Sequence, residues 1–307
     1  MPSWLVGSVL VMAAAGVNTL AAEPNQTSSR AGDIIAHDAN IADGVGYRLY
    51  EQRQPGGGQA PLAFYIGGSE GGLPTQRHDV PAALLKAGFS VATIGYFGFD
   101  GGPAQLSEID LNAVFSQVKA ATRHYGRPQR CVGVIGVSKG AELSLLMAVH
   151  TDAADVYVAA VPSSVAWQAS NITLRTKSSW RLGEEPVPFL RYPWFSKGAL
   201  DVLMGGSDFR AIHEAALKRK RAVANASIPV EIIATPVLLM SAKRDHVWPS
   251  YEMSQAMMSR LDSADRAHHF DHVAYDLNHY IFDHETVIAA AIAYLKKQLS
   301  AEGACGH

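Results

Sequence analysis

The feature that most constrains the fold is an apolar run that ends in a glycine-flanked serine and continues directly into a helical pattern. Residues 131–148 read CVGVIGVSKGAELSLLMA, so Gly136, Ser138 and Gly140 form a Gly-x-Ser-x-Gly turn. An uninterrupted apolar run of this length is typical of a strand buried on both faces, as in a parallel sheet. The turn therefore lies between a buried strand and a helix. Two interpretations stay open from this segment alone: a nucleophilic serine, or a tight turn that contains a serine.

The same alternation of apolar runs and helical patterns continues along the chain. Such a pattern predicts a mostly parallel sheet with helices on both faces. The expected strands are residues 46–53, 61–68, 89–98, 131–136, 155–162, 235–245 and 267–276, and the first of them is expected to be an early edge strand. The expected helices are residues 79–88, 105–125, 138–150, 250–261 and 285–299.

The chain divides into a leader, one large domain and a short tail. An apolar stretch from Trp4 to Ala15 is followed by small residues up to Ala22, the layout of a secretory signal, although no Lys or Arg precedes Arg30. We expect export, with an uncleaved membrane anchor as the alternative and no stable span once the signal is removed. The expected divisions are a signal peptide at 1–22, an N-terminal extension and edge strand at 23–60, the main domain at 61–300 with an aromatic-rich insertion at about 163–229, and a tail at 301–307.

Composition narrows the class of partner. Hydrophobic residues make up 48% of the 307 residues and charged residues 18%, which is typical of a globular protein. The net charge of −2 and the lack of a basic stripe exclude a nucleic-acid partner. The two cysteines, Cys131 and Cys305, offer no disulfide framework, and we interpret Cys131 as a small apolar residue of its strand.

A serine becomes a nucleophile when a histidine removes its proton and an acid orients that histidine. In the α/β-hydrolase fold these residues follow in the order Ser, Asp or Glu, His, each after a strand. Asp245 ends the apolar run 235–245, and His279 lies between the last strand and the last helix. We therefore expect an α/β-hydrolase fold with Ser138, Asp245 and His279 as a catalytic triad. The residues that fit these positions less well are Glu231, Asp262, Asp265, His246, His268, His269, His272, His284 and His307.

An oxyanion hole needs two backbone N–H groups near the nucleophile. We expect one from Lys139, directly after the serine, and the other from the glycine-rich segment GGSEGG, from Ser69 or, as second choice, Glu70. Glu142 is interpreted as a structural helix residue. The segment HHFDH at 268–272 matches no helical zinc motif, so we expect no metal and no cofactor.

Several segments together resemble one known family. These are IGGSEGGLP, LLKAGFSVATIGYFGF, GVIGVSKGAELSLLMA, DVLMG and LNHYIF, within residues 61–299. They resemble the C-terminal hydrolase domain of the acyl-CoA thioester hydrolase and bile-acid-CoA:amino-acid N-acyltransferase family. By that resemblance, Ser138, Asp245 and His279 take the triad positions. Serine at 138 is similar to the thioesterase branch, whereas the conjugating branch typically has cysteine.

The chain also departs from the family in two respects. The animal members carry a large N-terminal β-sandwich domain, and only about forty residues lie between the expected signal and Pro61, too few for such a domain. CoA thioesters belong to the cytosol, whereas the leader predicts export.

These observations predict a serine acyl hydrolase that cleaves a thioester or ester of a small-molecule substrate, in the manner of an acyl-CoA thioesterase. The alternatives are a carboxylesterase or dienelactone-hydrolase-like enzyme, an acyl-CoA N-acyltransferase, and a ligand-binding protein built on the same fold. The aromatic insertion either lines an acyl pocket or packs on itself as a cap core.

Overall fold

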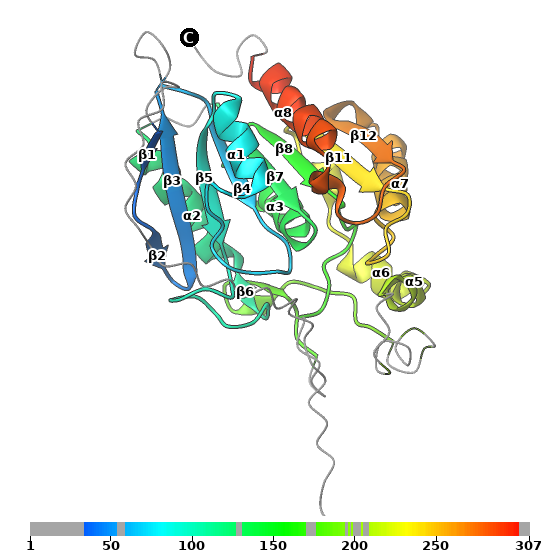
Figure 1. Cartoon of the computed structure of the whole chain (residues 1–307). Helices are drawn as coiled ribbons and strands as arrows, with labels where there is room; N and C mark the ends of the chain where they lie inside the picture. Colours follow the sequence, from blue (N-terminus) through cyan, green and yellow to red (C-terminus); the bar gives the residue numbers. More distant parts are fainter. Residues whose placement is uncertain are drawn as a thin grey trace, which may run out of the picture.

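The molecule is built around one large, mostly parallel β-sheet (Figure 1). The computed structural model describes residues 34–53, 59–126, 131–169, 176–193, 196, 198, 204 and 209–300. The sheet has nine strands in the order β1-β3-β5-β4-β7-β8-β11-β12, and β2 also pairs with β3. Every pair from β5 to β12 is parallel, and β3 pairs antiparallel with β5. The expected fold class, an α/β-hydrolase arrangement with a mostly parallel sheet, is confirmed.

The strands of this sheet coincide with the apolar runs of the sequence. The core strands β4, β5, β7, β8 and β11 are almost wholly buried, as expected for strands with helices on both faces. The bounds are β1 Ile34–Ala36, β2 Asn40–Ala42, β3 Val45–Gln52, β4 Leu62–Ile66, β5 Ser90–Gly95, β7 Val132–Val137, β8 Val156–Ala160, β11 Val237–Ala242 and β12 Phe270–Tyr275.

The predicted edge strand is not at the edge. Strand β3 lies one position inside it, because the short strands β1 and β2 both pair with its outer side. These two strands have three exposed residues each, so they are too short to show a two-residue periodicity in the sequence.

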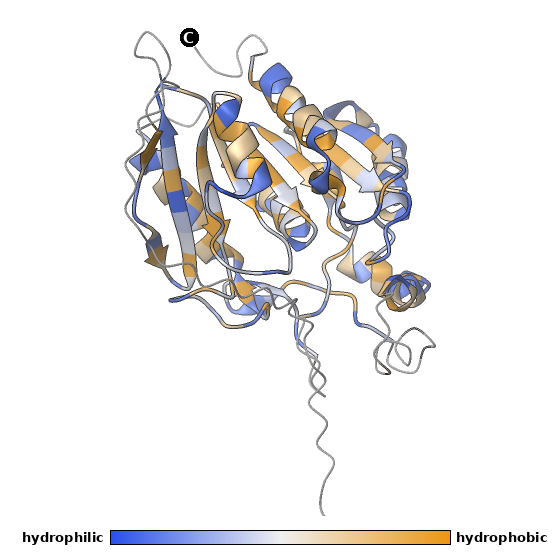
Figure 2. Ribbon diagram, viewed as in Figure 1, coloured by the Kyte–Doolittle hydropathy of each residue, from blue (hydrophilic) through white to orange (hydrophobic). Residues whose placement is uncertain are grey.

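Helices cover both faces of the sheet. Apolar residues of α2, α3 and α7 pack on one face, and those of α1 and α8 pack on the other. Figure 2 shows their hydrophobic positions interleaved with hydrophilic ones, as expected for helices with one buried side. The bounds are α1 Asp79–Lys86, α2 Leu111–His124, α3 Lys139–His150, α5 Arg210–Leu217, α6 Lys220–Ala226, α7 Ser250–Ser263 and α8 Glu285–Leu299, with short 3-10 turns η1 Val230–Ile232, η2 Ala267–His269 and η3 Ile281–Asp283.

Between β8 and β11 the regular alternation stops, as the sequence predicted. This region contributes the helices α5 and α6 and two short strands, β9 (Trp180–Leu182) and β10 (Glu185–Pro186). The two strands form a small second sheet with β6 (Ile109–Asp110). Two aromatic residues of this region, Trp167 and Trp180, are 1% and 0% exposed and pack in the interior. For these two residues the structure favours a cap core over the lining of an acyl pocket.

Cys131 does not fit the interpretation of an unpaired apolar residue. It is buried, and it forms a disulfide. Disulfides are formed and kept mainly in oxidising compartments. Cys305 and the expected leader, residues 1–22, lie outside the described residues. Among the residues that the structure describes, no helix is both long enough and apolar enough to span a bilayer.

Candidate active site

Ser138 stands on a strained turn between β7 and α3. Its φ and ψ are 54° and −117°, a backbone conformation that is costly for a residue with a side chain. A Cβ added at Gly136 would lie 2.2 Å from the carbonyl oxygen of Gly140, and one added at Gly140 would lie 2.3 Å from the carbonyl oxygens of Ile66 and Gly67. Both glycines are therefore required by close backbone contacts, which is the geometry of a nucleophile elbow.

The structure brings Ser138, His279 and Asp245 into one hydrogen-bonded chain. Nε2 of His279 lies 3.0 Å from Oγ of Ser138. On the other side of the ring, Nδ1 lies 2.9 and 3.0 Å from the two carboxylate oxygens of Asp245. Because a carboxylate only accepts, Nδ1 carries the proton and Nε2 is left to accept the serine proton. The three residues follow β7, β11 and β12, whose carboxyl ends meet at one edge of the sheet (Figure 1).

Asp245 is held ionised by its surroundings. Burial by itself would raise the pKa of this carboxyl, but hydrogen bonds from His279, Ser250 and the Val247 N–H outweigh it and lower the pKa. The hydroxyl of Ser250 donates to Oδ2 at 2.6 Å, and the N–H groups of Val247 and Trp248 donate to Oδ1 at 3.0 and 3.2 Å. An ionised, fixed carboxylate can orient the imidazole and stabilise its protonated form.

The glycine-rich loop after β4 lies against Ser138. A Cβ added at Gly68 would be 3.1 Å from Cβ of Ser138. The Gly68 N–H donates to Oε1 of Glu70 at 2.7 Å. By contrast, the N–H of Ser69 is not engaged by any hydrogen bond within the described part of the chain. The hydroxyl of Tyr96 fixes the loop from behind, 2.9 and 2.8 Å from the carbonyl oxygens of Gly67 and Gly68.

Lys139 is the first residue of α3, so its N–H has no acceptor one turn earlier in the helix. Its side chain is buried and pairs with Oε2 of Glu142 at 2.7 Å, with the ammonium 5.0 Å from the ring centre of Trp180. Glu142 is completely buried, and its other oxygen accepts from the indole N–H of Trp180 at 2.6 Å and from the N–H of Trp167 at 3.0 Å. Glu142 therefore links α3, the helix that follows Ser138, to the insertion.

The competing histidines lie elsewhere. His272 is on β12 with Nε2 2.7 Å from Oγ of Ser241, and His284 is the N-terminal cap position of α8. His246 adjoins Asp245 in sequence, but its ring packs against Tyr280.

The sequence analysis missed Tyr96, Ser250 and the partners of Glu142. Of these, only Ser250 could have been found from the sequence, because a serine at the start of the helix after Asp245 can reach that carboxylate.

Comparison with known proteins gives the family. The family model described as "BAAT / Acyl-CoA thioester hydrolase C terminal" matches residues 118–282, just over half of the chain, and this range includes Ser138, Asp245 and His279. The chain belongs to this family. The resemblance inferred from the sequence segments is thereby confirmed.

Relatives in the BAAT and acyl-CoA thioester hydrolase family cover parts of the chain. Acyl-coenzyme A thioesterase 6 of Mus musculus is 40% identical over 95 residues, 31% of this chain and 22% of that protein. The mitochondrial acyl-coenzyme A thioesterase 2 of Mus musculus is 26% identical over 211 residues, 68% of this chain and 42% of that protein. The bile acid-CoA:amino acid N-acyltransferase of Mus musculus is 31% identical over 96 residues, 31% of this chain and 22% of that protein. The chain thus spans less than half the length of these relatives.

Solved structures support the fold of this family member. An esterase of Pyrococcus furiosus superposes with a TM-score of 0.58 at 14% identity, covering 90% of this chain and 97% of that one. The acylaminoacyl peptidase of Pyrococcus horikoshii superposes with a TM-score of 0.56 at 11% identity, covering 88% of this chain and 41% of that one. At these identities the likeness establishes a shared fold and nothing finer.

Proposed function

We propose that this protein is a serine hydrolase that cleaves acyl thioesters or esters, with Ser138 as nucleophile, His279 as general base and Asp245 as the residue that orients the imidazole. The observation that carries the proposal is the hydrogen-bonded chain from Ser138 through His279 to Asp245, with 3.0 Å between Oγ and Nε2. The proposal is also supported by the match to a family whose members include acyl-coenzyme A thioesterases.

In the first half of the reaction, Oγ of Ser138 attacks the acyl carbonyl carbon while Nε2 of His279 takes the hydroxyl proton. The carbonyl oxygen becomes an oxyanion, which the N–H groups of Lys139 and Ser69 stabilise in our proposal. Ser69 is favoured over Gly68 because the Gly68 N–H is already engaged by Glu70. When the tetrahedral intermediate collapses, His279 returns the proton to the leaving thiolate or alkoxide, and an acyl-Ser138 ester remains.

In the second half, water attacks the acyl-enzyme. His279 takes one water proton, the carbonyl oxygen again becomes an oxyanion, and collapse releases the carboxylic acid with the proton returned to Ser138. A thioester suits this site because a thiol has a pKa of about 8.5, so its thiolate leaves with little help from the general acid. Serine at 138 favours hydrolysis over transfer to an amine, since the resemblance assigns cysteine to the conjugating branch.

The test is a hydrolysis panel of acyl-CoAs and simple esters of matched chain length. We expect turnover of both classes, without a strong preference for the simple esters, and a loss of at least about 10³-fold in kcat for Ser138→Ala. Ser69→Ala is the matched control, because it removes a neighbouring hydroxyl and keeps the backbone N–H. Activity that survives in Ser138→Ala would contradict the mechanism, and a strong preference for simple esters would reject the thioesterase assignment.

We also propose that the protein is exported. The apolar and small-residue pattern of residues 1–22 supports this, and so does the disulfide at Cys131, because cytosolic thiols are kept reduced. The acyl donor would then be a thioester or ester found outside the cytosol, and not a cytosolic acyl-CoA. Recovery of the native protein in the cytosolic fraction, with its thiols reduced, would contradict export.

A further inference from the structure

We propose that His37, Glu51 and His124 form a binding site for a divalent transition-metal ion such as Zn²⁺. These three residues, called here the His–Glu–His cluster, place one ligand atom each within 4.8 Å of one another. None of them takes part in the proposed hydrolysis.

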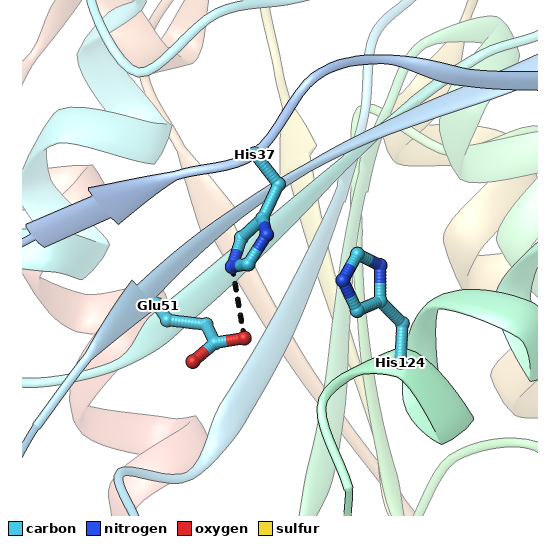
Figure 3. A group of neighbouring side chains, drawn as sticks. All are labelled: His37, Glu51 and His124. Atoms are coloured by element: carbon cyan, nitrogen blue, oxygen red, sulfur yellow. Dashed lines mark ion pairs between the residues drawn. The ribbon is translucent and has the colours of Figure 1, made fainter.

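Three separate elements supply the ligands (Figure 3). His37 lies between β1 and β2, and its N–H donates to the carbonyl oxygen of Leu49 on β3 at 2.9 Å. Glu51 is on β3, and His124 is the last residue of α2. The two imidazole rings meet edge to face, with centres 4.6 Å apart and an angle of 72° between their planes. The Glu51 carboxylate lies beside the His37 ring.

The contact between His37 and Glu51 leaves a buried nitrogen without a proper partner. Nε2 of His37 lies 2.9 Å from Oε1 of Glu51, yet among the described residues this buried atom makes no hydrogen bond of acceptable geometry. With a neutral imidazole in the tautomer that leaves Nε2 bare, a nitrogen lone pair and a carboxylate oxygen would face each other. A cation shared by the two atoms removes that repulsion, and it does not need the linear geometry of a hydrogen bond.

The second histidine is already oriented by a partner behind it. Nδ1 of His124 lies 3.1 Å from the hydroxyl of Tyr47, a buried residue of β3. When Nδ1 donates its proton to this hydroxyl, Nε2 carries the free lone pair that a metal needs. Metal-bound histidines usually have such a partner on the other ring nitrogen, which fixes tautomer and ring orientation.

The donor set indicates the kind of ion. Two imidazoles and a carboxylate suit Zn²⁺ and its neighbours, whereas Mg²⁺ and Ca²⁺ prefer oxygen ligands alone. A tetrahedral zinc ion with bonds of about 2.0–2.2 Å needs ligand atoms roughly 3.3–3.5 Å apart. Nε2 of His37 and Oε1 of Glu51, now 2.9 Å apart, would have to separate by about 0.5 Å, and ligand atoms at the 4.8 Å limit would have to approach by about 1.4 Å. His124 is exposed, which leaves room for water as a fourth ligand.

The position of the cluster indicates a structural role. Tyr50 pairs with Val91 near the start of β5, so Glu51 lies at the end of the sheet opposite the carboxyl ends that carry Ser138, Asp245 and His279. An ion at this point would join the N-terminal segment, β3 and the end of α2. It would add to stability without entering the chemistry.

The test is a Zn²⁺ titration of the full-length metal-free protein, followed by calorimetry and by thermal unfolding. We expect one Zn²⁺ per chain at this site and a rise in Tm of at least about 5 °C at saturating Zn²⁺. His124→Ala and Glu51→Gln should weaken that binding at least tenfold and abolish the rise in Tm. A double variant His268→Ala/His269→Ala, which removes two adjacent rings, one exposed and one half-buried, should bind as the wild type does.

A second readout distinguishes the cluster from other histidines. Co²⁺ bound by two imidazoles, a carboxylate and water should give visible absorption bands of a four-coordinate ion, present in His279→Ala and absent in His124→Ala. Equal Zn²⁺ affinity in the wild type and His124→Ala, or no stabilisation of the wild type, would overturn the proposal. Because a loss of hydrolysis would leave both readouts unchanged, failure of this site and failure of the proposed function are separable.

Discussion

At the scale of single residues, backbone sterics fix the turn that carries Ser138 between β7 and α3. Gly136 and Gly140 are required because a Cβ at either position would lie only 2.2–2.3 Å from a backbone carbonyl oxygen, and such glycines are visible in the sequence. The order of Ser138, Asp245 and His279 also correctly predicted which side chains meet. Tyr96 could not be assigned in this way, because its two carbonyl partners belong to another strand's loop and leave no local pattern.

His213 is a single residue for which the structure predicts a pH effect. Burial lowers its pKa to about 4, against smaller opposing effects that include a hydrogen bond to the Phe209 carbonyl oxygen. The ring packs against Trp167 and Trp248, and Nε2 lies 3.1 Å from the Tyr192 hydroxyl.

The sign of this effect follows from proton binding. The unfolded chain binds a proton at His213 below about pH 6.5, and the folded chain does so only near pH 4. The stability from neutral His213 is therefore complete above about pH 6.5 and is lost as the pH falls towards 4, by up to about 3 kcal/mol. Denaturant unfolding at several pH values should show a smaller acid-induced loss in His213→Gln than in the wild type. Equal losses in both proteins would contradict this assignment.

At the scale of elements, the sequence pattern predicted the longer strands of the main sheet and the helices that cover it, but neither the short strands β1 and β2 nor the contacts of the insertion. Helix α8 spans Glu285–Leu299 as expected, since its apolar face repeats regularly. The insertion contacts α3 through polar atoms instead: the carboxylate of Glu142 binds the indole of Trp180 and the backbone of Trp167. The hydrophobic pattern of the sequence does not indicate that the buried carboxylate of Glu142 pairs with Lys139, three positions earlier.

This buried pair gives an element-scale prediction. Burial lowers the pKa of Lys139, and Glu142 partly opposes that effect, so the ammonium depends on its partner. Glu142→Gln leaves that ammonium buried without a counter-ion and should lower the free energy of unfolding by about 3 kcal/mol. Adding Lys139→Met to the same protein removes the unpaired charge and should restore most of the stability, while the backbone N–H at position 139 is kept. Denaturant unfolding measures both variants, and a double variant no more stable than Glu142→Gln would contradict the argument.

At the scale of the whole molecule, the parallel sheet explains why residues 141 positions apart can meet. Strands β7, β11 and β12 run in the same direction, so the loops after them gather at one edge and supply Ser138, Asp245 and His279. The opposite end of the sheet carries the His–Glu–His cluster, which brings together residues from positions 37, 51 and 124. The sequence predicted that Ser138, Asp245 and His279 meet, because each follows an apolar run that forms a parallel strand and the order of these runs can be read along the chain. The His–Glu–His cluster depends on how β3 packs against α2, for which no motif exists.

The central claim is that Ser138 is a nucleophile activated by His279, and active-site labelling with a fluorophosphonate tests it most directly. Mass spectrometry of the labelled protein should place the probe on Ser138. Labelling should be absent in Ser138→Ala and slowed at least about 100-fold in His279→Gln. It should remain near the wild-type rate in His272→Gln, whose ring contacts Ser241 and not the nucleophile. Labelling of folded Ser138→Ala at the wild-type rate, or equal slowing in the two histidine variants, would contradict the account.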